Sequence, residues 1–137
     1  MYAQENIVGR KLSRHYFLIT LYGIKNCDSV KKARRWLDSN GVDYSFHDFR
    51  AHGLDPKQLD GWLQELGWET LLNRRGTTWR RLPEALRADM SAVAARKLML
   101  DYPTLIKRPL LHAYGRHLLG FVETEYRQYF SPRGKSP

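Results

Sequence analysis

The single cysteine of this chain, Cys27, is the residue best suited to nucleophilic chemistry. A thiolate attacks sulfur and oxyanion centres, and nearby positive charge stabilises it. Cys27 lies in the polar stretch Lys25–Ser29, between a predicted strand and the first turn of a predicted helix. The first N–H groups of a helix have no partner inside the helix and carry partial positive charge. The position therefore predicts a reactive thiol, although a lone cysteine is more often a small buried hydrophobe.

A lone thiol restricts the redox chemistry that the chain can perform by itself. One cysteine forms no internal disulfide, which excludes a disulfide scaffold and a CxxC pair. Val30 stands where such a pair would have its second cysteine. A mixed disulfide at Cys27 would therefore be resolved by an external thiol, such as glutathione or another protein thiol.

Two basic segments could serve the same site. Arg108-Pro109 precedes a predicted strand. A cis peptide bond there would place backbone polar groups beside the thiol. An ordinary trans proline at the end of an edge segment fits the pattern equally well. Arg74 and Arg75 lie in a Gly-containing loop, where they could bind a carboxylate through paired hydrogen bonds or simply be solvated. The five His residues form no HxxxH or Cys/His pattern, so no metal is expected.

Hydrophobic periodicity predicts the elements that position these residues. The apolar run Tyr16–Tyr22 predicts a buried strand, and 29–40 has helical spacing, with Asn26 or Asp28 as its cap. Further strands are expected at 42–47 and 104–106, further helices at 55–66, 68–72, 83–87, 91–101 and 122–129, and a hairpin at 110–112 and 117–119. This order predicts an α/β, thioredoxin-like fold, a mixed β-sheet flanked by helices, with a helical insertion subdomain.

The length of 137 residues fits one domain better than two. We expect a flexible leader at 1–15, a single thioredoxin-like domain at 16–130 with its helical insertion at about 54–102, and a disordered tail at 131–137. No apolar run approaches the ~20 residues that span a membrane. Met1–His15 has no apolar stretch resembling a signal peptide, so a cytoplasmic location is expected.

The net charge of +9 favours anionic partners. An acidic protein surface or a small anion would fit, and so would a basic surface that only keeps the protein in solution. We expect no direct binding of nucleic acid, no membrane contact, and a monomer in preference to an oligomer.

Several separated motifs, taken together, resemble the arsenate reductase/Spx family (ArsC-like), and most closely its YffB-like branch. The matching segments cover about 18–129 and occur in the same order; they are 21–33, 72–82, 105–109 and 120–121. The resemblance implies a thioredoxin fold with a helical subdomain. It implies Cys27 as nucleophile, Arg108 as an anion-binding arginine and Pro109 as a cis-proline. The expected substrate-binding residues are Lys25, Asn26, Arg74, Arg108 and Pro109.

The chain departs from true glutaredoxin-coupled arsenate reductases at three positions. Gly23 stands where those enzymes place a His, and Asn73 and Gly120 stand where they place arginines. Arg116 or His117 could reach toward the Gly120 position. Each charge-assisted hydrogen bond is worth roughly 1.5–3 kcal/mol. Efficient arsenate reduction is therefore not expected.

Three functions remain open from the resemblance. YffB-like proteins have been viewed as glutathione-dependent thiol reductases, which implies an enzyme that uses Cys27 with glutathione as co-substrate and no bound cofactor. Spx proteins are regulators that bind RNA polymerase, and many of them use a CxxC switch, which Val30 removes here. The basic surface would still permit docking to an acidic protein, so a binding protein without redox control is the second. A weak arsenate reductase is the third.

Overall fold

A computed structural model describes residues 18–131, which form two compact units. The sheet unit contains the chain up to His47 and again from Arg108, and the helical unit contains Asp48–Lys107. The helical insertion predicted at about 54–102 falls within the helical unit, while the single domain at 16–130 stays a prediction. The predicted leader at 1–15 and residues 132–137 of the predicted tail lie outside the described residues.

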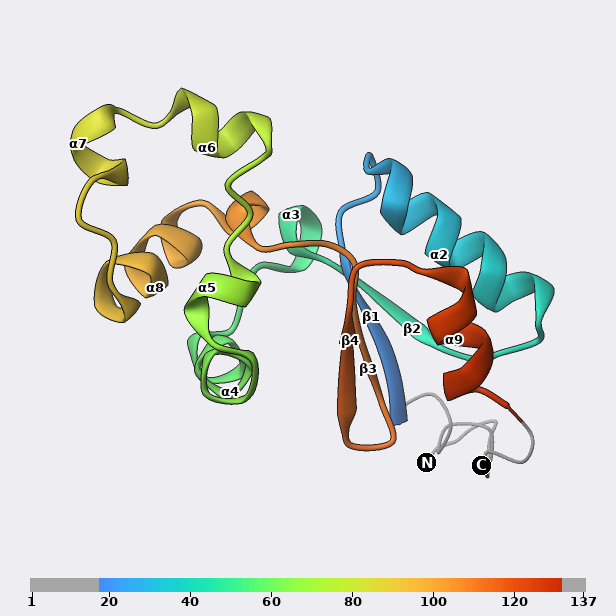
Figure 1. The fold of residues 1–137 in the computed structure, drawn as a ribbon. Helices are drawn as coiled ribbons and strands as arrows, with labels where there is room; N and C mark the ends of the chain where they lie inside the picture. The colour runs from blue at the N-terminus through green and yellow to red at the C-terminus, as the bar shows by residue number, and fades with distance from the viewer. Residues whose placement is uncertain (1–17, 132–137) are drawn as a thin grey trace. The chain divides into compact units, whose positions relative to one another are not determined.

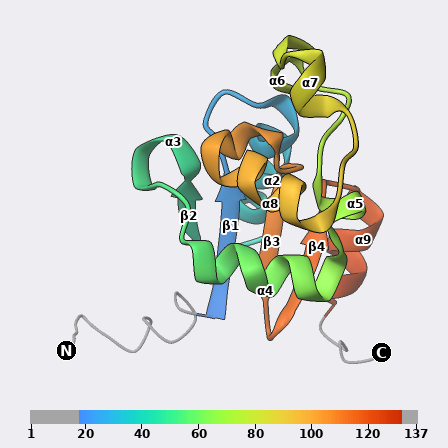
Figure 2. The ribbon, with the colours of Figure 1, turned by 90° about the vertical axis from the view of Figure 1, so that its left-hand side faces the viewer.

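The sheet unit is built on a mixed four-stranded sheet in the order β2-β1-β3-β4 (Figure 2). Its strands are β1 (Ile19–Gly23), β2 (Ser45–Asp48), β3 (Leu110–Ala113) and β4 (Arg116–Leu119). Strand β3 pairs antiparallel with both β1 and β4. The predicted α/β, thioredoxin-like class is confirmed.

Two helices, α2 (Asp28–Ser39) and α9 (Glu123–Tyr129), lie on the same side of this sheet (Figure 1). Successive strand side chains point to opposite faces, so alternate residues of β1 and β3 reach the helices. The buried cluster that results contains Ile19, Leu21, Val30, Ala33, Leu37, Leu111, Ala113 and Tyr126. The hydroxyl of Tyr129 also donates to the carbonyl of Ala113, which ties α9 to β3.

The β3–β4 hairpin closes through the two residues Tyr114 and Gly115. Both have left-handed backbones, with φ of 54° and 77°. Two positive φ values in a two-residue turn match the right-handed twist of the flanking strands. The predicted hairpin is confirmed, and it places His112 opposite His117, with ring centroids 4.6 Å apart.

The helical unit consists of short helices connected by tight loops. They are α3 (Phe49–His52), α4 (Pro56–Leu66), α5 (Trp68–Leu71), α6 (Thr77–Arg81), α7 (Glu84–Arg87), α8 (Ala92–Asp101) and the 3₁₀ helix η1 (Pro103–Leu105). Within residues 18–131, no helix is both long and apolar enough to cross a membrane.

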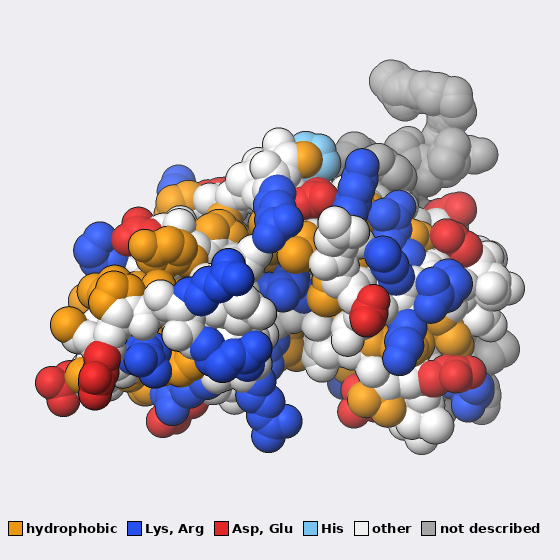
Figure 3. Space-filling model, turned by 90° about the horizontal axis from the view of Figure 1, so that it is seen from above, with side chains coloured by type: hydrophobic (Ala, Val, Ile, Leu, Met, Phe, Trp, Pro, Cys, Tyr) orange, Lys and Arg blue, Asp and Glu red, His pale blue; other side chains and the backbone are white. Residues whose placement is uncertain are grey.

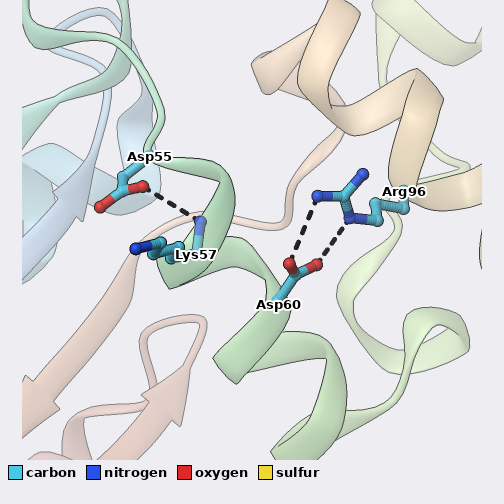
Figure 4. A network of polar contacts seen from close by, with 4 residues as sticks. All are labelled: Asp55, Lys57, Asp60 and Arg96. Atoms are coloured by element: carbon cyan, nitrogen blue, oxygen red, sulfur yellow. Dashed lines mark hydrogen bonds and ion pairs between the residues drawn. The ribbon is translucent and has the colours of Figure 1, made fainter.

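Side-chain caps fix where the two longest helices of this unit begin. Asp55 accepts a hydrogen bond from the backbone N–H of Lys57 at 3.0 Å at the start of α4, and the hydroxyl of Ser91 accepts one from Ala94 at 3.2 Å at the start of α8. Figure 4 shows the Asp55 cap beside a forked ion pair. In that pair the Arg96 side chain of α8 donates to both carboxylate oxygens of one aspartate on α4, at 2.6 and 3.3 Å.

The partner in this pair is Asp60. The hydrogen bond from Arg96 holds the pKa of the Asp60 carboxyl below its ordinary value. Both side chains are largely exposed, so the pair fixes the register of α4 against α8 more than it adds stability.

Several predicted boundaries are wrong. Cys27 itself is the N-cap of α2, so neither Asn26 nor Asp28 caps this helix. The second strand begins at Ser45 rather than Val42. The strand expected at 104–106 is η1 and an isolated bridge. Helices α3 and α6 were not predicted, because one turn is too short to show helical periodicity.

The end of β1 packs directly on the first turn of α2. A Cβ atom added to Gly23 would lie 2.7 Å from Cγ2 of Val30, a distance that real Cβ contacts essentially never show. Val30 is fully buried and β-branched, so its side chain has little room to move away. Glycine at this position therefore permits the close approach of strand and helix.

We expect Gly23→Ala to lower the free energy of unfolding by about 1–3 kcal/mol, because the added methyl overpacks the contact with Val30. Urea denaturation measures the change. In a Val30→Ala background the same substitution should cost less, giving a coupling energy of at least ~0.5 kcal/mol. Strictly additive losses would show that the two positions do not share this contact.

Tyr126 of α9 is fully buried, and its ring lies 5.6 Å from that of Trp36 and 4.8 Å from that of Phe121. Its hydroxyl has no hydrogen-bond partner in the described part of the chain. Burial, with a smaller contribution from Glu125, raises the pKa of this phenol well above its ordinary value. The hydroxyl therefore adds a desolvation cost without a compensating bond.

We expect Tyr126→Phe to raise the free energy of unfolding at pH 7 by about 1 kcal/mol, since an unsatisfied buried hydroxyl costs ~1–3 kcal/mol. The raised pKa also makes stability depend on pH. Below pH ~10 both states of the wild type hold this proton; above it the unfolded state loses the proton first, so stability falls as pH rises. Urea unfolding between pH 7 and 11 should show a shallower decline for the variant. Parallel declines would contradict the burial argument.

Candidate functional site

Cys27 occupies the junction between β1 and α2, where the sequence places it. It is the N-cap residue of a 12-residue helix, with an extended backbone (φ −145°, ψ 122°), and its carbonyl accepts a hydrogen bond from Lys31 at 2.9 Å. Its side chain makes no capping hydrogen bond and is partly exposed. The sulfur therefore lies at the positive end of the α2 dipole and can be reached from solvent.

The register of β1 and β3 brings two predicted segments to the same end of the sheet. Tyr22 pairs with Leu110, so the loop that follows β1 and the Arg108-Pro109 segment that precedes β3 both lie beyond this pair. The Arg108–Pro109 peptide bond is cis. Pro109 is buried, and its carbonyl accepts a hydrogen bond from the N–H of Gly120 at 2.8 Å.

The loop before the helix is held at both ends by buried side chains. Ile24 is 4% exposed and Val30 is fully buried, whereas Lys25 and Asn26 between them point outward. Lys25 adds positive charge beside Cys27, and the exposed carboxylate of Asp28 opposes it. Lys25 and Asn26 are therefore accessible to a substrate at Cys27, and their substrate-binding roles stay predictions.

The backbone conformation of Gly120 explains why this position departs from the arsenate reductase pattern. Gly120 has φ of 81°, a left-handed conformation that an arginine would adopt only with strain. The expectation that Arg116 reaches toward this position is wrong. Arg116 lies at the turn end of the hairpin, where its guanidinium is 5.3 Å from the ring of Tyr129, and His117 stacks on His112.

Arg74 belongs to the helical unit. Its guanidinium carbon lies 5.3 Å from the ring of Trp68 and 5.8 Å from that of Trp79, within the ~6 Å range of cation–π attraction. It lines a cavity of ≈ 410 Å³ together with Arg75 and Lys107. The Arg74 side chain is exposed beside these rings, so its N–H groups can still donate hydrogen bonds to an anion. Its predicted participation in a site at Cys27 stays a prediction.

Sequence reasoning missed Lys107 as part of this cavity, which Glu69 also lines, and it missed the two tryptophans as neighbours of Arg74. Backbone hydrogen bonds from Asn73 to Leu105 (2.7 Å) and from Lys107 to Leu71 (2.9 Å) bring Lys107 beside the arginine loop. This pairing joins segments more than thirty residues apart in the sequence, so local pattern contains no sign of it. The clustering of Trp68 and Trp79 around the arginines was the one usable signal.

Within residues 18–131, no three His, Cys, Asp or Glu side chains come together as possible metal ligands. The metal-free site stays an expectation.

The sequence and the fold were compared with known protein families, curated proteins and solved structures. The ArsC family model matches residues 22–129. A YffB protein of known structure is 52% identical, with a TM-score of 0.76 over 79% of this chain and 95% of that chain. An arsenate reductase (ArsC) related protein from Brucella melitensis is 50% identical, with a TM-score of 0.67 over 82% and 94%. The global transcriptional regulator Spx of Streptococcus agalactiae is 31% identical over 85% of each chain. The chain belongs to the ArsC family.

Proposed function

We propose that this protein is a cytoplasmic thiol reductase in which Cys27 is the nucleophile and glutathione is the external thiol. The observation that carries the proposal is the position of its one cysteine. Cys27 begins α2 with a partly exposed side chain, at the end of the sheet where the cis Arg108–Pro109 bond also lies. A helix N-terminus stabilises a thiolate there, and an open approach lets a disulfide reach it.

The reaction follows from having a single thiol. The Cys27 thiolate attacks one sulfur of a mixed disulfide between glutathione and a substrate thiol, so that an S–S bond forms to Cys27 and the substrate leaves as a thiolate. A second glutathione thiolate then attacks the glutathione sulfur bound to Cys27. Oxidised glutathione leaves, and the Cys27 thiolate is restored. The net reaction converts one mixed disulfide and one glutathione thiol into the free substrate thiol and oxidised glutathione, and no resolving cysteine is needed.

Anion binding would orient glutathione for these steps. Glutathione has two carboxylates, and arginine binds carboxylates through two parallel hydrogen bonds. Arg108 is partly exposed beside Pro109, in the same unit as Cys27. We assign Arg108 to one of the carboxylates, and Lys25 and Asn26 to the charge and backbone near the sulfur. The role of Arg74, which belongs to the helical unit, stays a prediction.

Cys27→Ser should abolish turnover of a cysteine–glutathione mixed disulfide without unfolding the protein. Serine is a favoured N-cap and removes only the nucleophile, so the free energy of unfolding should stay equal or rise by up to ~1 kcal/mol. Turnover is measured as glutathione-dependent formation of oxidised glutathione, and mass spectrometry should find one glutathione on the wild type and none on the variant. Full turnover by a folded Cys27→Ser protein would refute the mechanism.

Arg108→Ala should raise the KM for glutathione about tenfold, the equivalent of one charge-assisted hydrogen bond. Arg116→Ala is the matched control, because Arg116 belongs to the hairpin that follows Arg108 and lies at its turn end. Steady-state kinetics of both variants would measure the difference. Equal KM values in the two variants would remove Arg108 from the glutathione site.

A second candidate is a regulator like Spx that binds RNA polymerase. The 31% identity to the Spx protein of Streptococcus agalactiae supports it. In that case purified RNA polymerase would retain both the wild type and Cys27→Ser, and the wild type would turn over no mixed disulfide.

A weak arsenate reductase is the third candidate. Its test is arsenate-dependent consumption of reduced glutathione. The contact of Gly23 with Val30 argues against it, because the position of the missing His has no room even for a Cβ atom.

A further inference from the structure

A groove of ≈ 570 Å³ lies between α2 and α9, apart from the Cys27 loop. Lys32, Arg35 and Trp36 of α2 form one wall. Phe121, Glu123 and Arg127, in and just before α9, form the other. Both helices belong to the sheet unit, so the groove is complete within that unit. The groove is open to solvent, which suits a segment bound at the surface rather than an enclosed small molecule.

The walls of the groove carry more positive than negative charge, so the groove attracts an anion. Arg127 is neutralised by an ion pair with Glu123, whereas Lys32 and Arg35 are exposed and make no ion pair within residues 18–131. Figure 3 shows Lys and Arg side chains gathered over α2. The α2 dipole is negative toward Ser39, so an anion is favoured at the Lys32 and Arg35 part of the groove rather than at its far end.

The far end of the groove is apolar. A second cavity of ≈ 340 Å³ shares Trp36 and Arg127 with the first and continues to Val42 and Phe130. Trp36 is half-buried, with its ring 5.8 Å from that of Phe130. The two cavities thus form a trough, defined by their lining residues, that is basic at one end and aromatic at the other.

We propose that this trough binds a short acidic segment of a partner protein, with its carboxylates at Lys32 and Arg35 and one large apolar side chain against Trp36 and Phe130. An extended segment can present carboxylates to Lys32 and Arg35 and an apolar side chain to the aromatic end at the same time. Nucleic acid fits poorly, because its affinity depends on many phosphate contacts. Here only two cations are available, and Glu123 stands on the opposite wall. This site is independent of the thiol chemistry proposed above.

Fluorescence polarisation with the labelled peptide Asp-Glu-Asp-Leu-Phe tests the proposal. Binding should be saturable, absent for Asn-Gln-Asn-Leu-Phe, and about tenfold weaker in Lys32→Glu, the equivalent of ~1.4 kcal/mol. Lys31→Glu is the matched control: it is the neighbouring exposed residue, has the same charge change, and does not line the trough. Its affinity should change less than twofold.

Cys27→Ser should bind this peptide as the wild type does, whatever its effect on turnover. The absence of saturable binding would overturn the proposal. Equal losses in Lys31→Glu and Lys32→Glu, or equal binding of a ten-nucleotide single-stranded DNA, would replace it with unspecific charge attraction. A dimer in sedimentation that Lys32→Glu dissociates would assign the trough to a second copy of the chain.

Discussion

The contact between Gly23 and Val30 is the constraint on which the cysteine site depends. It lets the last residue of β1 approach the first turn of α2 closely, and the loop between them is then too short and too well anchored to move Cys27 elsewhere. Val30 fills the position of the second thiol in a CxxC pair with a fully buried side chain. Packing and redox chemistry are linked at this residue, because the valine that supports the helix is also the reason that the protein has one thiol rather than two.

Cys27 breaks a local rule at this same junction. Helices prefer Ser, Thr, Asp or Asn at the N-cap, and a residue without a capping side chain forgoes about 1 kcal/mol. Helices α4 and α8 follow the rule with Asp55 and Ser91, whereas α5, α6, α7 and α9 also begin without a side-chain cap. The missing cap therefore does not single out Cys27; its reactivity rests on a partly exposed thiol at the positive end of α2.

The sequence predicted the elements with strong local signals and missed those set by distant contacts. Helix α4 and the hairpin were found because Asp55-Pro56 and Tyr114-Gly115 are local start and turn signals. The 3₁₀ turn at Pro103 was read as a strand because short apolar runs are ambiguous between the two. At the site, Cys27 could be predicted from its own loop. The cavity around Arg74 could not, because Lys107 reaches it through a bridge between Leu72 and Ile106.

The net charge of +9 does not by itself identify an anion-binding site. The surroundings of each cation decide how strongly it binds an anion. The guanidinium of Arg74 lies beside two indole rings, and the Nε atom of Arg108 is buried. Lys32 and Arg35 are exposed, so their side chains remain flexible. A flexible exposed cation loses side-chain entropy on binding, which cancels much of its attraction to an anion. Arg108 therefore loses less entropy than Lys32 or Arg35 when it binds a carboxylate, and the trough depends on its aromatic end for affinity as well as on its two cations.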